Sequence, residues 1–181
     1  GDIWTDRSFD WKHVAALGRL ELAMIPNALP GRASVRASVV AGANRYLAAQ
    51  RANPWALAFT PADNLFDWGS NNLVLNNLIV IASAFDITND RTYRDAVIEG
   101  MDYLLGRNAL NQSYVTGYGD KFSQAMHSRW YANSVNPAMP KPPNGSIAGG
   151  PNSDAPTWDP VAADKLPSCV ATPQFCYIDD I

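Results

Sequence analysis

The positions of the prolines set the strongest limit on how this sequence can fold. Nine of the 13 prolines lie between Pro137 and Pro173. Because proline lacks an amide hydrogen and its ring obstructs the preceding helical turn, long regular helices are excluded from this stretch. Before residue 107, by contrast, apolar residues recur every three or four positions, which is the helical period. The sequence therefore predicts helices first and long ordered loops afterwards.

Four helices are expected in the first part of the chain, arranged as helix pairs over about residues 8–106. They cover Phe9 to about Ile25, Ala33 to about Ala52, Asn71 to about Phe85, and Thr92 to about Leu105. Ser8 is the expected N-cap of the first helix, and Gly106 is the expected C-cap of the fourth. The third helix is apolar nearly all round, which is typical of a helix buried inside a larger assembly.

The loop-rich segment 107–181 is expected to hold at most a short helix, near Asp159 to Asp164, and no alternation is strong enough to predict a sheet. The composition excludes other classes. A formal net charge of −3 with intermixed signs argues against nucleic acid or an anionic membrane as partner. The longest apolar run, Leu73 to Phe85, is too short and too polar to span a bilayer.

Two cysteines, Cys169 and Cys176, flank Pro173 in the loop-rich segment. The natural interpretation is a disulfide that staples a loop of a secreted protein. A pair of reduced thiols is the alternative. Zinc is disfavoured because no Cys-x-x-Cys pair or neighbouring histidine is present.

The segment 113–131 is expected to present side chains rather than pack them. Gly117 and Gly119 flank Tyr118 and allow sharp turns. His127 and Arg129 stand two residues apart, so on an extended loop both fall on the same side of the chain. Both could then donate hydrogen bonds to one oxygen-rich ligand, such as a carboxylate, a phosphate or a sugar. The alternative is a buried histidine bonded to backbone beside a rim arginine.

Five motifs in this order resemble the C-terminal part of glycoside hydrolase family 9, the family of inverting cellulases. They are Tyr-Leu-Leu-Gly-Arg-Asn at 103–108, Ser-Tyr-Val-Thr-Gly-Tyr-Gly at 113–119, His-Ser-Arg at 127–129, Gly-Gly-Pro-Asn at 149–152 and Tyr-Ile-Asp at 177–179. The resemblance runs from about Trp68 to Ile181. It implies an all-α fold, the C-terminal portion of an (α/α)6 toroid with long ordered loops, so that residues 1–181 form a single partial catalytic domain.

The resemblance also implies roles for particular residues. His127 matches the histidine of the first active-site signature and would hold the sugar beside the scissile bond together with Arg129. Asp179 matches the aspartate of the second signature, where a carboxylate accepts hydrogen bonds from hydroxyls or orients its neighbours. Trp68 resembles an aromatic residue that lines the cleft and stacks on a glucose ring. Tyr118 and Trp130 are further candidates for this wall, and packing of the loops is the alternative for each aromatic residue.

An inverting glycosidase needs a general acid and a general base. In the family the base aspartates lie in the N-terminal half and the acid is a glutamate beyond the position of Asp179, so neither is assigned here. The expected function is hydrolysis of β-1,4-glucosidic bonds in cellulose or related β-glucans, with this chain supplying part of the substrate cleft. The expected partners are a β-glucan or cello-oligosaccharide and the missing N-terminal part of the domain.

Two other functions stay open: a non-catalytic carbohydrate-binding or helical scaffold module, and a different sugar-processing toroid such as a lyase or phosphorylase. No cofactor is expected to be required. The family often binds structural calcium in acidic loops. Residues 86–90 offer suitable oxygen ligands, although such a turn is more often merely solvated. The expected location is extracellular.

Overall fold

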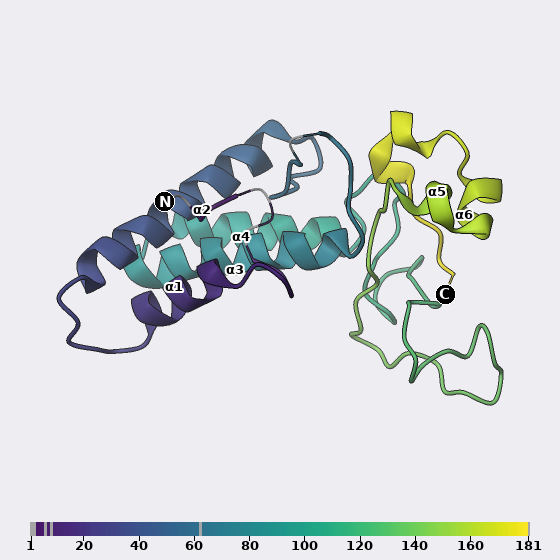
Figure 1. The fold of residues 1–181 in the computed structure, drawn as a ribbon, viewed down its shortest axis with the longest axis horizontal. Coiled ribbons are helices and arrows are strands. Elements are labelled where there is room, and N and C mark those ends of the chain that lie inside the picture. Colours follow the sequence, from purple (N-terminus) through teal and green to yellow (C-terminus); the bar gives the residue numbers. More distant parts are fainter. Residues whose placement is uncertain (1–2, 6, 8, 62, 181) are drawn as a thin grey trace. The chain divides into compact units, whose positions relative to one another are not determined.

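The computed structural model describes residues 3–5, 7, 9–61 and 63–180. The chain forms two compact units (Figure 1). The first unit comprises residues 1–61 and 72–101, and the second comprises residues 62–71 and 102–181. Each unit therefore contains segments that are distant in the sequence, because the chain passes between the units three times.

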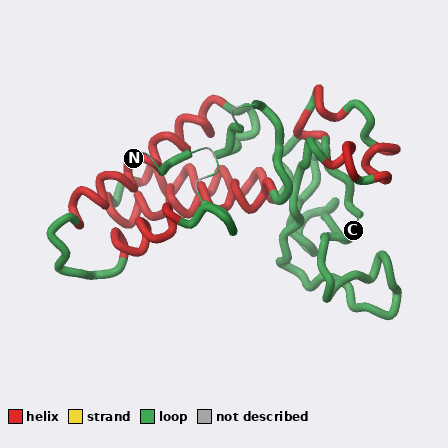
Figure 2. Tube along the Cα trace, in the orientation of Figure 1, coloured by secondary structure: helices red, strands yellow, loops and turns green. Residues whose placement is uncertain are grey.

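Four long helices dominate the first part of the chain (Figure 2). They are α1 (Ala15–Met24), α2 (Arg32–Ala52), α3 (Ser70–Thr88) and α4 (Arg91–Leu104). The last three lie within three residues of the ranges expected from the apolar periodicity. The predicted turn at residues 86–91 is shorter than expected, since α3 continues to Thr88.

The start of the first helix was predicted wrongly. It begins at Ala15 rather than Phe9. The Asp10 carboxylate accepts hydrogen bonds from the backbone N–H groups of Lys12 and His13, at 2.8 and 2.7 Å. These bonds fold residues 10–13 into a turn, and a short polar side chain that competes for backbone donors is a known alternative to helix. Ser8, the expected N-cap, lies outside the described residues.

The core of the first unit is built on the apolar stripe of α2, with Val39, Ala43 and Tyr46 buried. Polar contacts fix the helices around it. Buried Gln50 of α2 donates from Nε2 to the backbone oxygen of Ala96 in α4, at 2.7 Å. This bond gives the buried Nε2 group of Gln50 a partner inside the core and links α2 to α4. The buried stripe of α2 is thus the face that packs.

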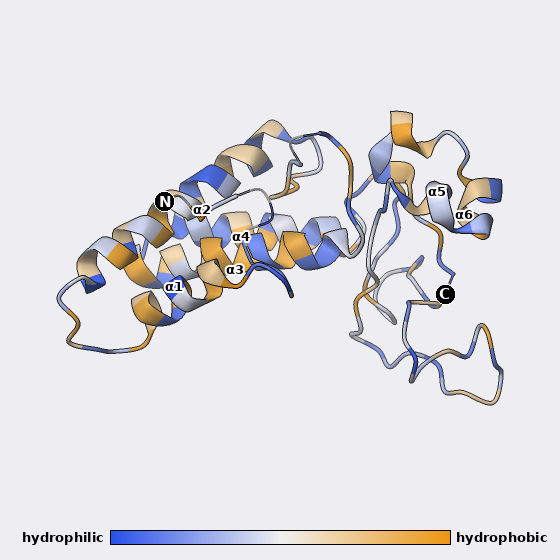
Figure 3. Cartoon of the chain, viewed as in Figure 1, coloured by the Kyte–Doolittle hydropathy of each residue, from blue (hydrophilic) through white to orange (hydrophobic). Residues whose placement is uncertain are grey.

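Helix α3 is the most apolar of the four, and orange hydrophobic residues recur along these helices in Figure 3. Its residues Val74, Val80, Ile81 and Ala84 are fully buried or nearly so. Ile79 is nevertheless 48% exposed. One face of α3 therefore remains uncovered within the residues that the structure describes.

Helix α4 ends as the sequence predicts, at Gly106 with a backbone φ of +126°. The Arg107 N–H donates to the Asp102 oxygen at 2.8 Å, and the Gly106 N–H donates to the Tyr103 oxygen at 3.4 Å. This pair of bonds is the Schellman arrangement, which satisfies the last carbonyls of a helix. It turns the chain from α4 into the loops of the second unit.

The acidic segment considered for calcium serves as a helix boundary. Asp86 lies within α3, and the Asp90 carboxylate accepts from the Thr92 N–H at 2.9 Å at the start of α4. Within the described part of the chain, no group of three or more His, Cys, Asp or Glu residues is placed to hold a metal ion. Calcium binding stays a prediction.

The second unit holds two short helices, α5 (Ala155–Trp158) and α6 (Pro160–Lys165), followed by 3-10 turns at Cys169–Ala171 and Pro173–Phe175. Helix α6 covers the position expected for a short helix. Cys169 and Cys176 form a disulfide across these turns. Apart from the first residues of α3 and the last residues of α4, the other described residues in this unit are loops with isolated β-bridges only. None of the helices in the described ranges is long and apolar enough to cross a membrane.

Candidate substrate-binding site

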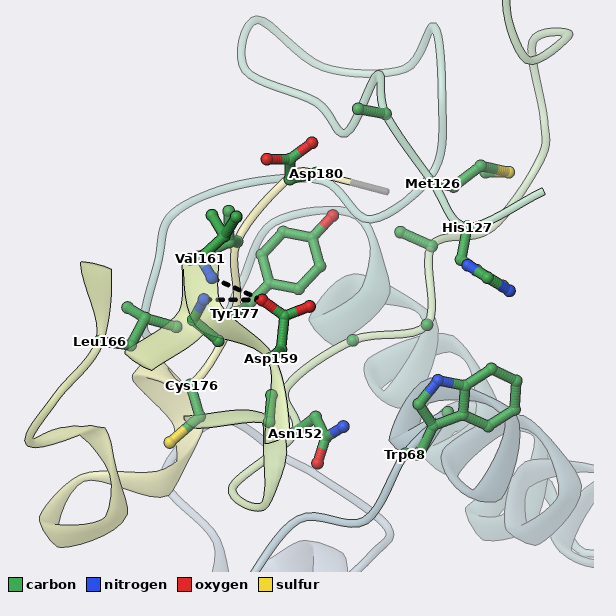
Figure 4. A pocket seen from close by; sticks show the side chains of 18 of the residues that line it. Trp68, Met126, His127, Asn152, Asp159, Val161, Leu166, Cys176, Tyr177 and Asp180 are labelled. Carbon is green, nitrogen blue, oxygen red and sulfur yellow. Dashed lines mark hydrogen bonds between the residues drawn. The ribbon is translucent and has the colours of Figure 1, made fainter. Parts of the chain in front are cut away.

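The second unit contains a cavity of about 330 Å³ (Figure 4). Four loop segments and the α5–α6 pair form its walls. Among the lining residues are two tryptophans, one histidine, one tyrosine and two aspartates: Trp68, His127, Trp158, Asp159, Tyr177 and Asp180. A cavity with an apolar wall and a few polar groups suits a small uncharged polar ligand such as a sugar ring.

Trp68 and His127 lie against each other on one side of this cavity (Figure 4). Their ring centroids are 6.2 Å apart and the rings meet edge to face at 81°. The Trp68 side chain is 59% exposed although it is in this contact. The structure therefore brings together two residues that are 59 positions apart in the sequence. The His127 side chain is exposed, so the alternative of a buried histidine does not hold.

The His127 segment follows a loop pinned by backbone bonds. Ser113 donates to Lys121 and accepts from Ser123, with both N–O distances 2.9 Å. Gly117 and Gly119 have φ angles of +77° and +90°, so the expected turns are present. This fold fixes the chain just before it reaches the cavity.

Asp179 holds the two residues that follow this loop. Its carboxylate accepts from the Gln124 N–H at 2.7 Å and from the Ala125 N–H at 3.0 Å. The Tyr177 hydroxyl donates to the same carboxylate at 3.1 Å. Asp179 is not among the residues that line the cavity, whereas its neighbour Asp180 is. The Asp179 side chain is thus engaged with the chain that leads to His127.

Three tyrosine rings pack in series next to Asp179 and are called here the tyrosine cluster: Tyr103, Tyr114 and Tyr177. Ring centroids are 5.9 Å apart in the first pair and 5.1 Å apart in the second. Burial is the main cause that raises the pKa of each hydroxyl above the ordinary value of 10.0. The Tyr177 hydroxyl also lies 2.6 Å from the Ser123 hydroxyl. The cluster therefore supports the cavity with neutral side chains.

The Gly-Gly-Pro-Asn motif forms another wall of the cavity. It lies against the start of α3, where buried Asn71 donates from Nδ2 to the Ala148 oxygen at 2.9 Å. A side-chain carbon on Gly150, whose φ is +86°, would come within 2.5 Å of the Asn71 side chain. Only glycine fits such a close approach and such a backbone angle. The motif is thus explained by packing at the cavity edge.

Sequence reasoning missed Trp158 and Asp159, at the junction of α5 and α6. Trp158 lines the cavity and is 58% exposed. Asp159 caps α6, because its Oδ1 accepts from the N–H groups of Val161 at 2.8 Å and Ala162 at 2.9 Å. A signal was present in the sequence, since Asp followed by Pro is a helix-start pattern, but nothing linked this helix to the cavity.

Arg129, Tyr118 and Trp130 are not among the residues that line the cavity. Tyr118 is 54% exposed and Trp130 is 78% exposed. The structure brings Trp68 and His127 together but leaves these three on the surface of the loops around them. Their substrate-binding role stays a prediction.

Comparison with known proteins gives one consistent family. A family model described as "Glycosyl hydrolase family 9" matches residues 2–181. Endoglucanase C of Cellulomonas fimi is 52% identical over 99% of this chain, which corresponds to 16% of that protein. Cellulose 1,4-beta-cellobiosidase of Acetivibrio thermocellus is 38% identical over 94% of this chain and 19% of that protein. The chain thus spans a small part of the length of these relatives.

Solved structures agree with the sequence relatives. The crystal structure of GH family 9 endoglucanase J30 superposes with a TM-score of 0.80 over 96% of this chain and 31% of that chain, at 26% identity. The structure of AaCel9A in complex with cellobiose-like isofagomine gives a TM-score of 0.75 over 94% of this chain and 31% of that one, also at 26% identity.

Proposed function

Because this chain belongs to glycosyl hydrolase family 9, we propose that it supplies part of the substrate cleft of an enzyme that hydrolyses β-1,4-glucosidic bonds with inversion. The substrate class is cellulose or a related β-glucan. The relatives named as endoglucanase and cellobiosidase support this choice. Inversion is the stereochemical outcome that the family resemblance implies.

One observation carries the proposal: the contact between Trp68 and His127 at the edge of one cavity. A flat, exposed indole offers the apolar face of a glucosyl ring a surface to stack on. The imidazole beside it can donate to, or accept from, a sugar hydroxyl. Stacking and hydrogen bonding from adjacent side chains would fix both the position and the rotation of one sugar unit.

Asp179 is proposed as a positioning residue. It acts through Gln124 and Ala125, whose N–H groups it accepts, and so holds the backbone that leads to His127. Charge-assisted bonds to two successive amides resist rotation of that segment more than a single neutral bond would. The imidazole would then meet the sugar without a further ordering cost.

Residues outside this sequence would complete the site. Inverting hydrolysis requires a general acid and a general base on opposite faces of the sugar. The chain spans 16% of one relative and 19% of another, which leaves most of each relative unaccounted for. We therefore propose that the rest of the catalytic domain provides at least one of these carboxylates. An extracellular location is proposed as well, since the disulfide between Cys169 and Cys176 suits an oxidising compartment.

The test is hydrolysis of cellohexaose by the chain produced together with the rest of its catalytic domain, followed by NMR of the first products. The α-anomer at the new reducing end is the expected first product. A β-anomer would refute inversion. Binding without hydrolysis would favour a carbohydrate-binding module, and cleavage that requires phosphate would favour a phosphorylase.

A further inference from the structure

Asp159, at the α5–α6 junction, faces the cavity from the side opposite Trp68 and His127. In Figure 4 Asp159 and Val161 lie on one side of the opening and the tryptophan and histidine lie on the other. Trp158, the residue before Asp159, belongs to the same lining. The α5–α6 junction therefore contributes Trp158 and Asp159 to the lining, and none of the five sequence motifs includes them.

We propose that Trp158 and Asp159 form a second sugar-binding wall, which contacts a β-linked glucosyl unit across from Trp68. This inference rests on the proposed β-glucan cleft. The indole of Trp158 is 58% exposed while it lines the cavity, so a ligand would remove apolar surface from water. Stacking on the apolar face of a sugar ring is the contact that such an indole offers.

Asp159 adds directional recognition. Its Oδ1 is held by the N–H groups of Val161 and Ala162, and these bonds fix the orientation of the carboxylate. Its other oxygen points toward the open centre of the cavity (Figure 4). A carboxylate oxygen accepts hydrogen bonds only, and sugar hydroxyls are donors, so the second oxygen would select a ring with a hydroxyl at that position.

The segment that leads into Trp158 and Asp159 is held in place by two hydrogen bonds. Thr157 Oγ1 donates to the Asp154 backbone oxygen at 2.7 Å, which closes the turn before Trp158. The backbone N–H of Asn152 donates to the oxygen of Cys176 at 2.7 Å, and Cys176 is disulfide-bonded to Cys169. A binding wall on short helices needs such support, because a loosely held site loses affinity through ordering cost.

The test is calorimetric titration of the chain, produced together with the rest of its catalytic domain, with a non-hydrolysable thio-linked analogue of cellohexaose, in wild type and variants. Trp158→Ala is expected to weaken binding about two- to tenfold, and Trp158→Phe should recover most of the loss. Asp159→Asn keeps the cap, since Asn caps helices as well as Asp does. It replaces an acceptor in the cavity by a donor, and about tenfold weaker binding is expected.

Matched controls are Asp164→Asn, an exposed aspartate of α6 paired with Lys165 at 3.1 Å, and Trp11→Ala, a tryptophan of the first unit that is 84% exposed. Both should bind as wild type does. If His127→Ala weakens binding while the Trp158 and Asp159 variants do not, the second wall is refuted and the proposed cleft stands. If the assembled wild-type domain does not bind this analogue, the cleft and the second wall are both refuted.

Discussion

Replacement of Asp179 tests how the segment before His127 is held. Asp179→Ala removes the acceptor for three donors: the N–H groups of Gln124 and Ala125 and the hydroxyl of Tyr177. A hydrogen bond to a charged group contributes about 1.5–3 kcal/mol. Because Gln124 is exposed, water can replace the carboxylate at that amide at little cost. The two remaining bonds, at the low end of the range, give a loss of about 3 kcal/mol in the free energy of unfolding.

Asp179→Asn separates charge from shape. The amide oxygen can still accept from Ala125 and Tyr177, which both bond to Oδ1 in the native chain. The amide nitrogen would then face the Gln124 N–H, donor against donor. A loss of about 1–2 kcal/mol is expected, smaller than that of the alanine variant. Asp120→Asn, an exposed aspartate in the same loop, is the matched control and should not change stability.

Two measurements decide whether Asp179 positions His127 or only stabilises the fold. Hydrogen exchange of the Ala125 amide should accelerate about tenfold for each 1.4 kcal/mol lost locally. Cellohexaose affinity should fall in the alanine variant and recover partly in the asparagine variant. Unchanged exchange at Ala125 would refute the bonding argument. Full affinity in a destabilised alanine variant would leave Asp179 a purely structural residue.

Three further outcomes are expected from the packing. Gly42→Ala should destabilise the first unit by about 1–3 kcal/mol, because the added carbon would lie 2.5 Å from the Trp4 ring. Gly18→Ala should stabilise it by about 1 kcal/mol, because the space at that position is open and alanine favours the helix. Chemical denaturation measures both changes. The tyrosine cluster has pKa values raised above 10.0, so the folded state binds these protons more tightly. Its stabilisation is complete below pH 10 and is lost as the pH rises, by about 1.4 kcal/mol per pH unit for each tyrosine. Ionisation of these tyrosines, followed by ultraviolet absorbance, should coincide with loss of circular dichroism, and ionisation in the folded state would contradict this. Reduction of the Cys169–Cys176 disulfide should lower the free energy of unfolding by about 2.5 kcal/mol, because the unfolded chain gains loop entropy. An unchanged denaturation midpoint after reduction would show that the disulfide does not stabilise these turns.

The fold class could be predicted from the sequence because periodicity and family motifs agree. The expectation of an all-α chain that forms part of an (α/α)6 toroid is confirmed by the helices and by the superposition on endoglucanase J30. The family itself was identified from five motifs and is confirmed. The start of α1 was harder to predict, because a side chain competes there with the helix for backbone N–H groups. The Asp10 carboxylate accepts from two amides that a helix would otherwise use, so α1 begins later in the sequence.

The site was predicted only in part. His127 lies in a family motif, Trp68 resembles a cleft-lining aromatic residue of the family, and the two meet in the structure. Trp158 could not be assigned to the cavity, because only the long-range folding of the α5–α6 segment brings it there. The orientation of Asp179 was likewise hidden, since adjacent aspartates look alike in a sequence, and the hydrogen bonds to Gln124 and Ala125 are what distinguish Asp179 from Asp180.

Trp68 and His127 are proposed to form one wall of a β-glucan cleft. An NMR titration with the thio-linked cellohexaose analogue tests this in the assembled catalytic domain, with isotope labels in this chain only, and follows the indole N–H signals of its six tryptophans and its histidine ring signals. Saturable shifts of the Trp68 and His127 signals are expected, with an unchanged Trp11 signal. Shifts confined to residues outside the cavity, or no shift of the Trp68 and His127 signals, would contradict it.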